Sequence, residues 1–302
     1  MGGMTSEEIC VKKRVLILGG TGMLGHTLFA HLSSHTDLDV YATVRTANGL
    51  SQWFAPDLLT KIQVGVDAND FDTIIHAFAR TLPDIVINCI GLIKQLPIAD
   101  DPVAAITINS LLPHRISMTC SSVGARMIHI STDCVFDGEK GNYTEGDCSN
   151  ANDLYGRSKF LGEVAYPPHC LTLRTSIVGH ELKGNLGLIE WFLSQEGRIR
   201  GFTNAIYSGF PTIEIARIIT DYILPRPELA GVYHASSDPI SKYDLLKLVA
   251  GKYGKNIEIE PYDDLRLDHS LNSSAFRRLT GYVPRSWPEL VDKMYQDFIS
   301  TL

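Results

Sequence analysis

Short hydrophobic runs alternate with amphipathic stretches through the first half of the chain. The run RVLIL at 14–18 is too short for a helix and is followed by glycines, which is typical of a buried parallel strand. The same pattern predicts strands at 39–44, 61–66, 84–90, 125–130 and 170–175. Helical patterns lie between them, as at 23–33 and 101–122. This alternation predicts an α/β protein with a doubly wound parallel sheet, the Rossmann fold.

The pattern becomes less regular after residue 176. It predicts helices at 185–196, 212–223, 241–253 and 287–300, and short strands at 231–236 and 256–261. We therefore expect a dinucleotide-binding domain at 1–175 and a smaller α/β lobe, mainly for substrate, at 176–302. Later strands such as 231–236 are candidates to return to the first domain.

Composition narrows the class of protein. With 44% hydrophobic and 20% charged residues, the chain is typical of globular proteins, and its net charge of -7 argues against nucleic acid as a partner. Six cysteines lack CxxC pairs and metal-ligand spacing, which indicates reduced thiols in the cytoplasm and no metal site. No apolar run approaches the ~20 residues of a membrane span.

The first residues show neither a basic start nor the apolar core of a secretory signal, so we do not expect secretion. Gly2 and Ser6 match the short myristoylation pattern. We favour an irregular tail without a lipid, with Met4 as an alternative start.

The segment GGTGMLG, at 19–25, follows the first predicted strand and opens a helix. Its glycines, at Gly19, Gly22 and Gly25, permit a tight turn and close backbone approach. A helix N-terminus offers free amides and a positive dipole end to a pyrophosphate. We therefore expect this turn, including Met23 and Leu24, to hold a dinucleotide.

The end of the second predicted strand bears on the choice of cofactor. NAD enzymes usually place an acid there for the ribose hydroxyls, whereas this chain has Arg45. A guanidinium suits a 2′-phosphate, which favours NADP(H) and leaves NAD(H) as the alternative if Arg45 is only a surface residue. Asp67, after the third strand, is expected either to meet the adenine amino group or to cap the helix that begins near Asp70.

Tyr155 and Lys159 form a YxxxK pair, and residues four apart share one face of a helix. An ammonium near a phenol favours the phenolate and lowers the phenol pKa, so that Tyr155 can exchange a proton with a carbonyl or hydroxyl oxygen. Thr132 comes directly after a predicted strand, at the sheet edge where α/β sites form. We expect its hydroxyl to hold the same oxygen.

Together these segments resemble a known family. GGTGMLG, NCIG at 88–91, STDCVFDG and YGRSK occur in the order and spacing of the extended short-chain dehydrogenase/reductases, and LRTSIVG and GVYHASS look most like the dTDP-4-dehydrorhamnose reductases. The resemblance implies a catalytic triad of Thr132, Tyr155 and Lys159. It also implies that Asn88, Cys89 and Gly91 border the nicotinamide, and that the C-terminal lobe holds a nucleotide sugar.

Some residues depart from that pattern. The related 4,6-dehydratases have a Glu where this chain has Cys134, which disfavours a dehydratase. A Cys there, with a His after the next strand, resembles GDP-fucose synthase, so Cys134 and His180 form a candidate acid–base pair for epimerisation. The alternative is that Cys134 is simply packed and His180 is a loop residue.

Other residues are expected near the substrate. Asp133 follows Thr132 directly, and Lys94 lies just beyond the nicotinamide-side turn, although its ammonium alternatively extends to solvent. Arg174 is expected either to reach the substrate or to pair with a carboxylate. Asn109 sits within a helical pattern and is expected to hold a backbone distortion near the site or to be half exposed.

The resemblance implies NADPH-dependent reduction of the 4-keto group of a nucleotide-linked 6-deoxyhexose, in deoxysugar synthesis for a surface polysaccharide. Tyr155 protonates the oxyanion, Thr132 hydrogen-bonds it, and Lys159 holds the nicotinamide ribose. The alternatives are a bifunctional 3,5-epimerase/4-reductase, an epimerase that retains NAD, and a non-catalytic regulatory subunit. A homodimer through two packed helices is a further expectation from the resemblance.

Overall fold

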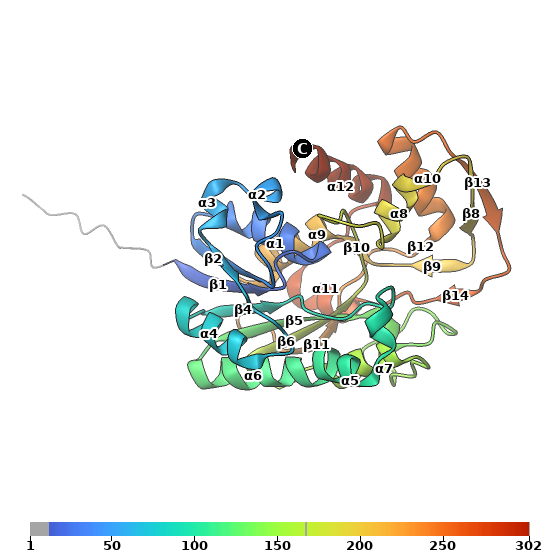
Figure 1. Ribbon diagram of the computed structural model, residues 1–302. Helices are drawn as coiled ribbons and strands as arrows, with labels where there is room; N and C mark the ends of the chain where they lie inside the picture. Colours follow the sequence, from blue (N-terminus) through green and yellow to red (C-terminus); the bar gives the residue numbers. More distant parts are fainter. Residues whose placement is uncertain (1–11, 167, 302) are drawn as a thin grey trace, which may run out of the picture.

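A parallel sheet of seven strands forms the centre of the protein, in the order β11-β6-β5-β4-β1-β2-β3 (Figure 1). The structure is a computed structural model that describes residues 12–166 and 168–301, so Gly2, Met4 and Ser6 lie outside the described residues. The strands are β1 (Lys13–Leu18), β2 (Leu38–Val44), β3 (Ile62–Val64), β4 (Ile85–Asn88), β5 (Arg126–Thr132), β6 (Cys170–Thr175) and β11 (Gly231–His234).

The predicted doubly wound sheet is confirmed, with each predicted strand of the first half close to its expected position. The strand predicted at 61–66 is shorter, because Gly65 turns the chain with a φ of 85°. Conversely, β5 continues to Thr132, where it pairs with the end of β6. This longer strand carries Thr132 to the carboxyl edge of the sheet.

Helices cover both faces of the sheet (Figure 1). In β1, Val15 and Ile17 pack on one face with α1, whereas Leu16 and Leu18 pack on the other with α4 and α6. This alternation follows from the two-residue period of a strand. The helices of the first half are α1 (Met23–Ser33), α2 (Leu50–Trp53), α3 (Pro56–Leu59), α4 (Phe71–Thr81), η1 (Pro97–Asp100), α5 (Pro102–Ala105), η2 (Ile106–Leu111), α6 (Leu112–Val123), η3 (Asp133–Val135) and α7 (Leu154–Leu161).

The second half builds the smaller lobe and also returns to the sheet. The four predicted helices are confirmed, and they are joined by short strands. The elements are β7 (Ile177–Val178), α8 (Leu188–Ser194), β8 (Arg198–Phe202), β9 (Ala205–Tyr207), β10 (Phe210–Pro211), α9 (Thr212–Ile218), η4 (Ile219–Ile223), β12 (Ile240–Ser241), α10 (Lys242–Tyr253), β13 (Glu258–Tyr262), β14 (Leu267–Asp268), α11 (Ser274–Thr280) and α12 (Trp287–Thr301).

Two of these late elements belong to the layers of the first half. The strand predicted at 231–236 is β11, which pairs in parallel with β6 and completes the sheet. Helix α9 packs on α1, where the Thr27 hydroxyl donates to Thr212 Oγ1 over 3.1 Å. The first layers therefore include chain from beyond residue 176.

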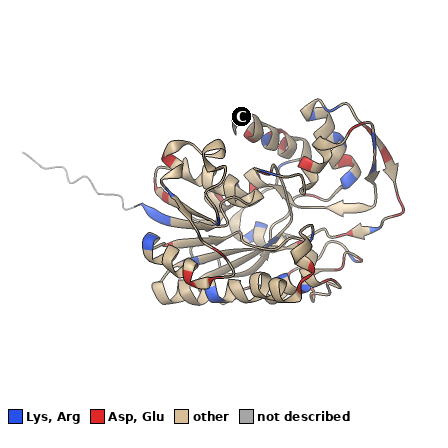
Figure 2. Cartoon of the chain, in the orientation of Figure 1, with Lys and Arg blue, Asp and Glu red and all other residues tan. Residues whose placement is uncertain are grey.

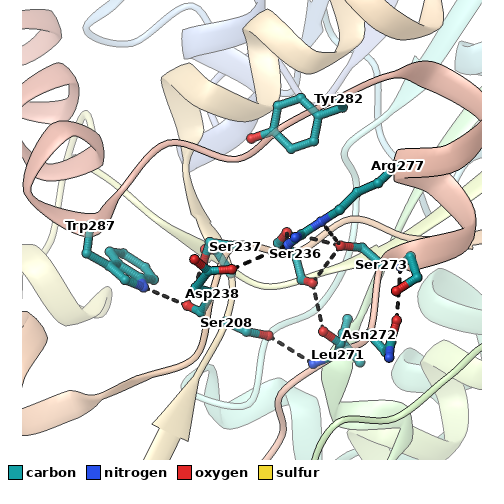
Figure 3. A network of polar contacts seen from close by, with 12 residues as sticks. Ser208, Ser236, Ser237, Asp238, Leu271, Asn272, Ser273, Arg277, Tyr282 and Trp287 are labelled. Carbon is teal, nitrogen blue, oxygen red and sulfur yellow. Dashed lines mark hydrogen bonds and ion pairs between the residues drawn. The ribbon is translucent and has the colours of Figure 1, made fainter.

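A buried polar network joins β11 to the smaller lobe (Figure 3). The Ser236 hydroxyl, just after β11, donates to the Leu271 carbonyl over 2.8 Å, and the Arg277 guanidinium of α11 donates to the Ser236 carbonyl over 2.9 Å. The Trp287 indole of α12 donates to the Asp238 carbonyl over 2.7 Å. These bonds hold together three segments that are far apart in the sequence.

Charged residues are spread over both the lower helices and the upper lobe (Figure 2). Within the described ranges 12–166 and 168–301, no helix is long and apolar enough to cross a membrane.

Candidate active site

The glycine turn between β1 and α1 is shaped for close approach of a ligand. Gly19 has a φ of 89°, which favours glycine, and the Gly22 amide donates to the Gly19 carbonyl over 3.0 Å. A Cβ on Gly25 would lie 2.1 Å from the Gly19 carbonyl oxygen, so the helix and the turn pack backbone to backbone. Helix α1 has no side-chain cap and no acidic residue in its first turn.

These features fit the phosphates of a dinucleotide, because the uncapped amides at Met23 and Leu24 are available as donors. Arg45 follows β2 directly, is exposed, and makes no ion pair with a described residue. Because β2 lies next to β1, Arg45 is at the same sheet edge as the turn.

Asp67 supports its own turn. Its Oδ1 accepts from the Asn69 backbone amide at 3.0 Å and from the Asn69 side chain at 3.1 Å. The cap of α4 is Asp70, which accepts from the Asp72 amide. Asp67 therefore braces the turn that leads to α4 and is not itself the helix cap.

The loop after β4 lies beside the YxxxK helix. Asn88 is fully buried, and its Oδ1 accepts from the Ile90 amide over 3.1 Å. A Cβ on Gly91 would lie 3.8 Å from Lys159 Nζ, which shows how closely this loop approaches the ammonium. Burial raises the pKa of the Cys89 thiol to about 12, so this thiol stays neutral.

Asn109 fixes this loop from a distorted helix. It lies in η2, a π-helical segment between α5 and α6, and such segments are frequent at functional sites. Its Oδ1 accepts from the Leu92 amide over 2.8 Å, and its Nδ2 donates to the Ser158 hydroxyl over 3.2 Å. The sequence expectation of a backbone distortion held by Asn109 is therefore confirmed.

Thr132, Tyr155 and Lys159 converge at the carboxyl end of β5. Thr132 is buried and accepts from the Cys134 amide over 3.1 Å, and its hydroxyl donates to Asp133 Oδ1 over 3.1 Å. A side-chain hydrogen bond also links Thr132 with Tyr155. The Lys159 ammonium, one turn farther along α7, donates to the Ile130 carbonyl over 2.8 Å.

The charges in this group differ from the sequence expectation. Burial raises the pKa of Tyr155, and Cys134 raises it further, whereas the hydrogen bond with Thr132 lowers it. Burial also lowers the pKa of Lys159 to about 8. Desolvation of the phenolate therefore outweighs the stabilisation by Lys159 that the YxxxK spacing alone predicts.

Cys134 and His180 are not brought together. The His180 ring bonds to Glu190 through Nδ1 at 2.5 Å and to the Tyr253 hydroxyl through Nε2 at 2.8 Å. The same ring stacks on Phe298 at 4.0 Å between centroids. Both ring nitrogens are thus occupied within the smaller lobe, and burial raises the pKa of Cys134 to about 12.

Arg174 forms a buried ion pair, the second of its two sequence alternatives. Its Nε and Nη2 donate to the Glu163 carboxylate, each over 2.7 Å, and both side chains are nearly inaccessible to solvent. The Ser131 hydroxyl donates to Glu163 as well. The guanidinium supports the sheet beneath the site and is not presented to a substrate.

Lys94 extends to the triad. Its ammonium lies 5.5 Å from the centre of the Tyr155 ring and 2.5 Å from Asp153 Oδ2. The sequence reasoning missed Asp153, which is the N-cap of α7 and accepts from the Gly156 amide over 2.7 Å. The feature of the sequence that could have identified Asp153 is an Asp directly before the helix expected around the YxxxK pair, which is a typical N-cap position.

The parallel sheet, the glycine turn and the Thr–Tyr–Lys group together define the extended short-chain dehydrogenase/reductase class. The chain belongs to the family described as "RmlD substrate binding domain", whose model matches residues 13–299.

Curated relatives cover nearly the whole chain. Methionine adenosyltransferase 2 subunit beta of Mus musculus is 23% identical, over 98% of this chain and 94% of that protein. Spore coat polysaccharide biosynthesis protein SpsK of Bacillus subtilis (strain 168) is 27% identical, over 94% of this chain and 97% of that protein.

Among solved structures, dTDP-4-dehydrorhamnose reductase from Bacillus anthracis, in complex with NADP, superposes with a TM-score of 0.77 at 22% identity. The superposition covers 95% of this chain and 100% of the Bacillus anthracis chain. This similarity confirms the fold.

Proposed function

We propose that the protein uses NADPH to reduce the 4-keto group of a nucleotide-linked 6-deoxyhexose. The observation that carries this proposal is the convergence of Thr132, Tyr155 and Lys159 beside Gly91, at the sheet edge that also holds the glycine turn. The family, the NADP complex of the Bacillus anthracis reductase and the polysaccharide role in the name of SpsK support it.

The residues divide the work as follows. The amides of 22–25 and the Arg45 guanidinium bind the cofactor phosphates, and Lys159 holds the nicotinamide ribose. When bound, NADPH supplies the hydride that is added to C4. Thr132 donates a hydrogen bond to the oxygen as its charge develops, and the Tyr155 O–H breaks to protonate that oxygen.

The substrate lobe is proposed to consist of 176–302 without β11 and α9, which belong to the sheet layers. We propose that Asp133, Cys134 and Lys94, which all lie near Tyr155, line the sugar site. Neither Arg174 nor His180 is included, because both are occupied by carboxylates in the folded chain.

The test is NADPH and NADH oxidation at 340 nm with 4-keto-6-deoxyhexoses linked to different nucleotides. We expect NADPH-dependent turnover, and a fall of about 10²- to 10⁴-fold in Tyr155→Phe, which lacks the proton donor. Tyr166→Phe, at an exposed tyrosine outside the site, should leave the rate unchanged. Failure of every sugar with both cofactors would refute the proposal.

A second candidate is a non-catalytic regulatory subunit. It is favoured by the match to methionine adenosyltransferase 2 subunit beta over 98% of this chain. Isothermal calorimetry with a methionine adenosyltransferase catalytic subunit separates the two candidates, because Tyr155→Phe should abolish reduction but leave such binding intact. Tight binding combined with no sugar turnover would favour this second candidate.

We further propose a cytoplasmic homodimer. The five described cysteines are all free thiols, which fits a reducing compartment. Adjacent helices expose Val103 by 73%, Met118 by 70% and Leu161 by 61%, an apolar face that suits an isologous contact with a second copy.

A further inference from the structure

A second cation lies beside the catalytic tyrosine. Lys94, in the loop after β4, places its ammonium 5.5 Å from the centre of the Tyr155 ring. Lys159 approaches from within α7, but its ammonium already donates to the Ile130 carbonyl of β5. Lys94, from another segment of the chain, is thus the lysine whose ammonium lies over the Tyr155 ring.

The position of Lys94 is fixed by Asp153. The ion pair spans 2.5 Å, and the other carboxylate oxygen of Asp153 accepts from the Gly156 amide at the start of α7. The same carboxylate therefore anchors the helix that carries Tyr155 and the ammonium that lies over its ring. This coupling ties the loop after β4 to the catalytic helix.

We propose that Lys94 is a positioning residue for the proton step, in which its ammonium, held by Asp153, stabilises the phenolate left when Tyr155 gives up its proton. An ammonium near the ring of a tyrosine is attracted by the ring electrons, and more strongly by the phenolate. The inference rests on the proposed role of Tyr155.

The other charged groups around Tyr155 act in the opposite direction. Asp133, from η3, and Asp153 are carboxylates that raise the pKa of Tyr155 by disfavouring a second negative charge. Burial opposes the charge of Lys94, but its ion pair with Asp153 raises its pKa above the ordinary value, so Lys94 keeps that charge. Lys94 therefore offsets neighbours that hinder formation of the phenolate.

One titratable group faces the pair from the smaller lobe. His269, just after β14, interacts with Asp153 and lowers its pKa. Its effect on Tyr155 is indirect, because it acts on the carboxylate and not on the phenol. His269 is unchanged in every variant proposed below, so its effect does not contribute to the difference in Tyr155 midpoint between two variants.

The test is a titration of Tyr155 in the full chain with saturating NADP+, by phenolate absorbance at 295 nm. Subtracting the curve of Tyr155→Phe isolates the signal of this residue and requires no sugar substrate. Lys94→Met should raise the midpoint by about one pH unit, and Lys94→Arg should stay close to wild type, because arginine keeps the charge.

The chain provides a matched control in Lys140. This exposed lysine also pairs with an aspartate, Asp147, at 2.5 Å and lies 5.7 Å from the centre of a tyrosine ring, that of Tyr143, outside the site. Lys140→Met should leave the Tyr155 midpoint unchanged.

A double-mutant cycle tests the role of Asp153. Asparagine caps helices as well as aspartate does, so Asp153→Asn keeps the cap and removes the ion pair. The shift caused by Lys94→Met should then shrink by half or more in the Asp153→Asn background.

Three results would overturn the inference: an unchanged midpoint in Lys94→Met, an equal shift in Lys140→Met, or no signal that depends on Tyr155. If the titration behaves as expected while no sugar is reduced, the inference stands and the proposed reductase activity fails.

Discussion

At the scale of single residues, burial determines the charges in this site. Lys159 is 5% exposed, and its ammonium has one hydrogen bond, to the Ile130 carbonyl. Burial therefore lowers its pKa from 10.5 to about 8. Because this pKa is close to neutral pH, a bound ribose or nicotinamide can change the protonation of the Lys159 amine. Keeping the buried amine protonated at neutral pH also lowers the free energy of unfolding.

This cost leads to a prediction with a defined sign. Between pH 8 and 10.5 the unfolded chain retains a proton on Lys159 that the folded chain has lost, so folding becomes more favourable as pH rises. Relative to Lys159→Met, wild type should gain about 2 kcal/mol in free energy of unfolding from pH 7.5 to pH 9.5. Urea unfolding at both pH values measures this, and a constant difference between the two proteins would contradict it.

Individual residues also show which parts of the candidate site could be predicted from the sequence and which could not. The grouping of Thr132, Tyr155 and Lys159 was predictable from a strand end, from helical spacing and from the family resemblance, and their catalytic role stays a prediction. Arg174 lies near the end of β6 and His180 follows β7. Their orientation depends on partners 10 or more residues away in the sequence: Glu163 for Arg174, and Glu190 with Tyr253 for His180. No local pattern reveals such partners.

At the scale of elements, the turn between β1 and α1 tolerates little change. The helix approaches the turn so closely that even a methyl group on Gly25 would meet the Gly19 carbonyl at 2.1 Å. The atoms that this methyl group would meet belong to the backbone of Gly19 and Gly20, so they cannot move aside as the end of a flexible side chain could. The position of the amides that we propose to bind the cofactor phosphates depends on this contact.

Two glycines in helices provide a direct comparison. Gly25→Ala should weaken NADPH binding at least tenfold and lower the melting temperature, because the turn must shift. Gly251→Ala, in α10, meets nothing within 4 Å and should instead stabilise the protein by about 1 kcal/mol without changing NADPH binding. Fluorescence titration and thermal unfolding measure both, and normal NADPH affinity in Gly25→Ala would show that the contact is dispensable.

The long strands and helices were predictable because each repeats its hydrophobic period several times. The two-residue strands β7, β10, β12 and β14 have no such repeat, and the sequence did not predict them. The π-helical turn at Asn109 is a similar case, since the sequence indicated a distortion there but not its form.

At the scale of the whole molecule, the two parts share one core. Val15 and Ile17 of the sheet belong to the same cluster of buried residues as Leu245 of α10 and Leu290 of α12. The smaller lobe therefore packs on the nucleotide-binding layers through continuous apolar contact. We expect the two parts to unfold together.

The proposed homodimer is testable at this scale. Met118→Glu places a charge on the exposed apolar face of α6 and should shift the protein from dimer to monomer in sedimentation velocity. Leu279→Glu, at a position exposed by 56% on α11, should leave the dimer intact. A monomeric wild type at micromolar concentration would exclude this interface.

The return of β11 to the sheet sets the order in which the protein can be completed during synthesis. Its seventh strand is translated only after residues 176–230 have been added to the end of β6, and until then β6 has an unpaired edge. The layers around the seven-stranded sheet therefore cannot be completed before much of the smaller lobe has been synthesised. A nascent chain of this topology depends on chaperones or rapid elongation to keep that edge from pairing with another chain.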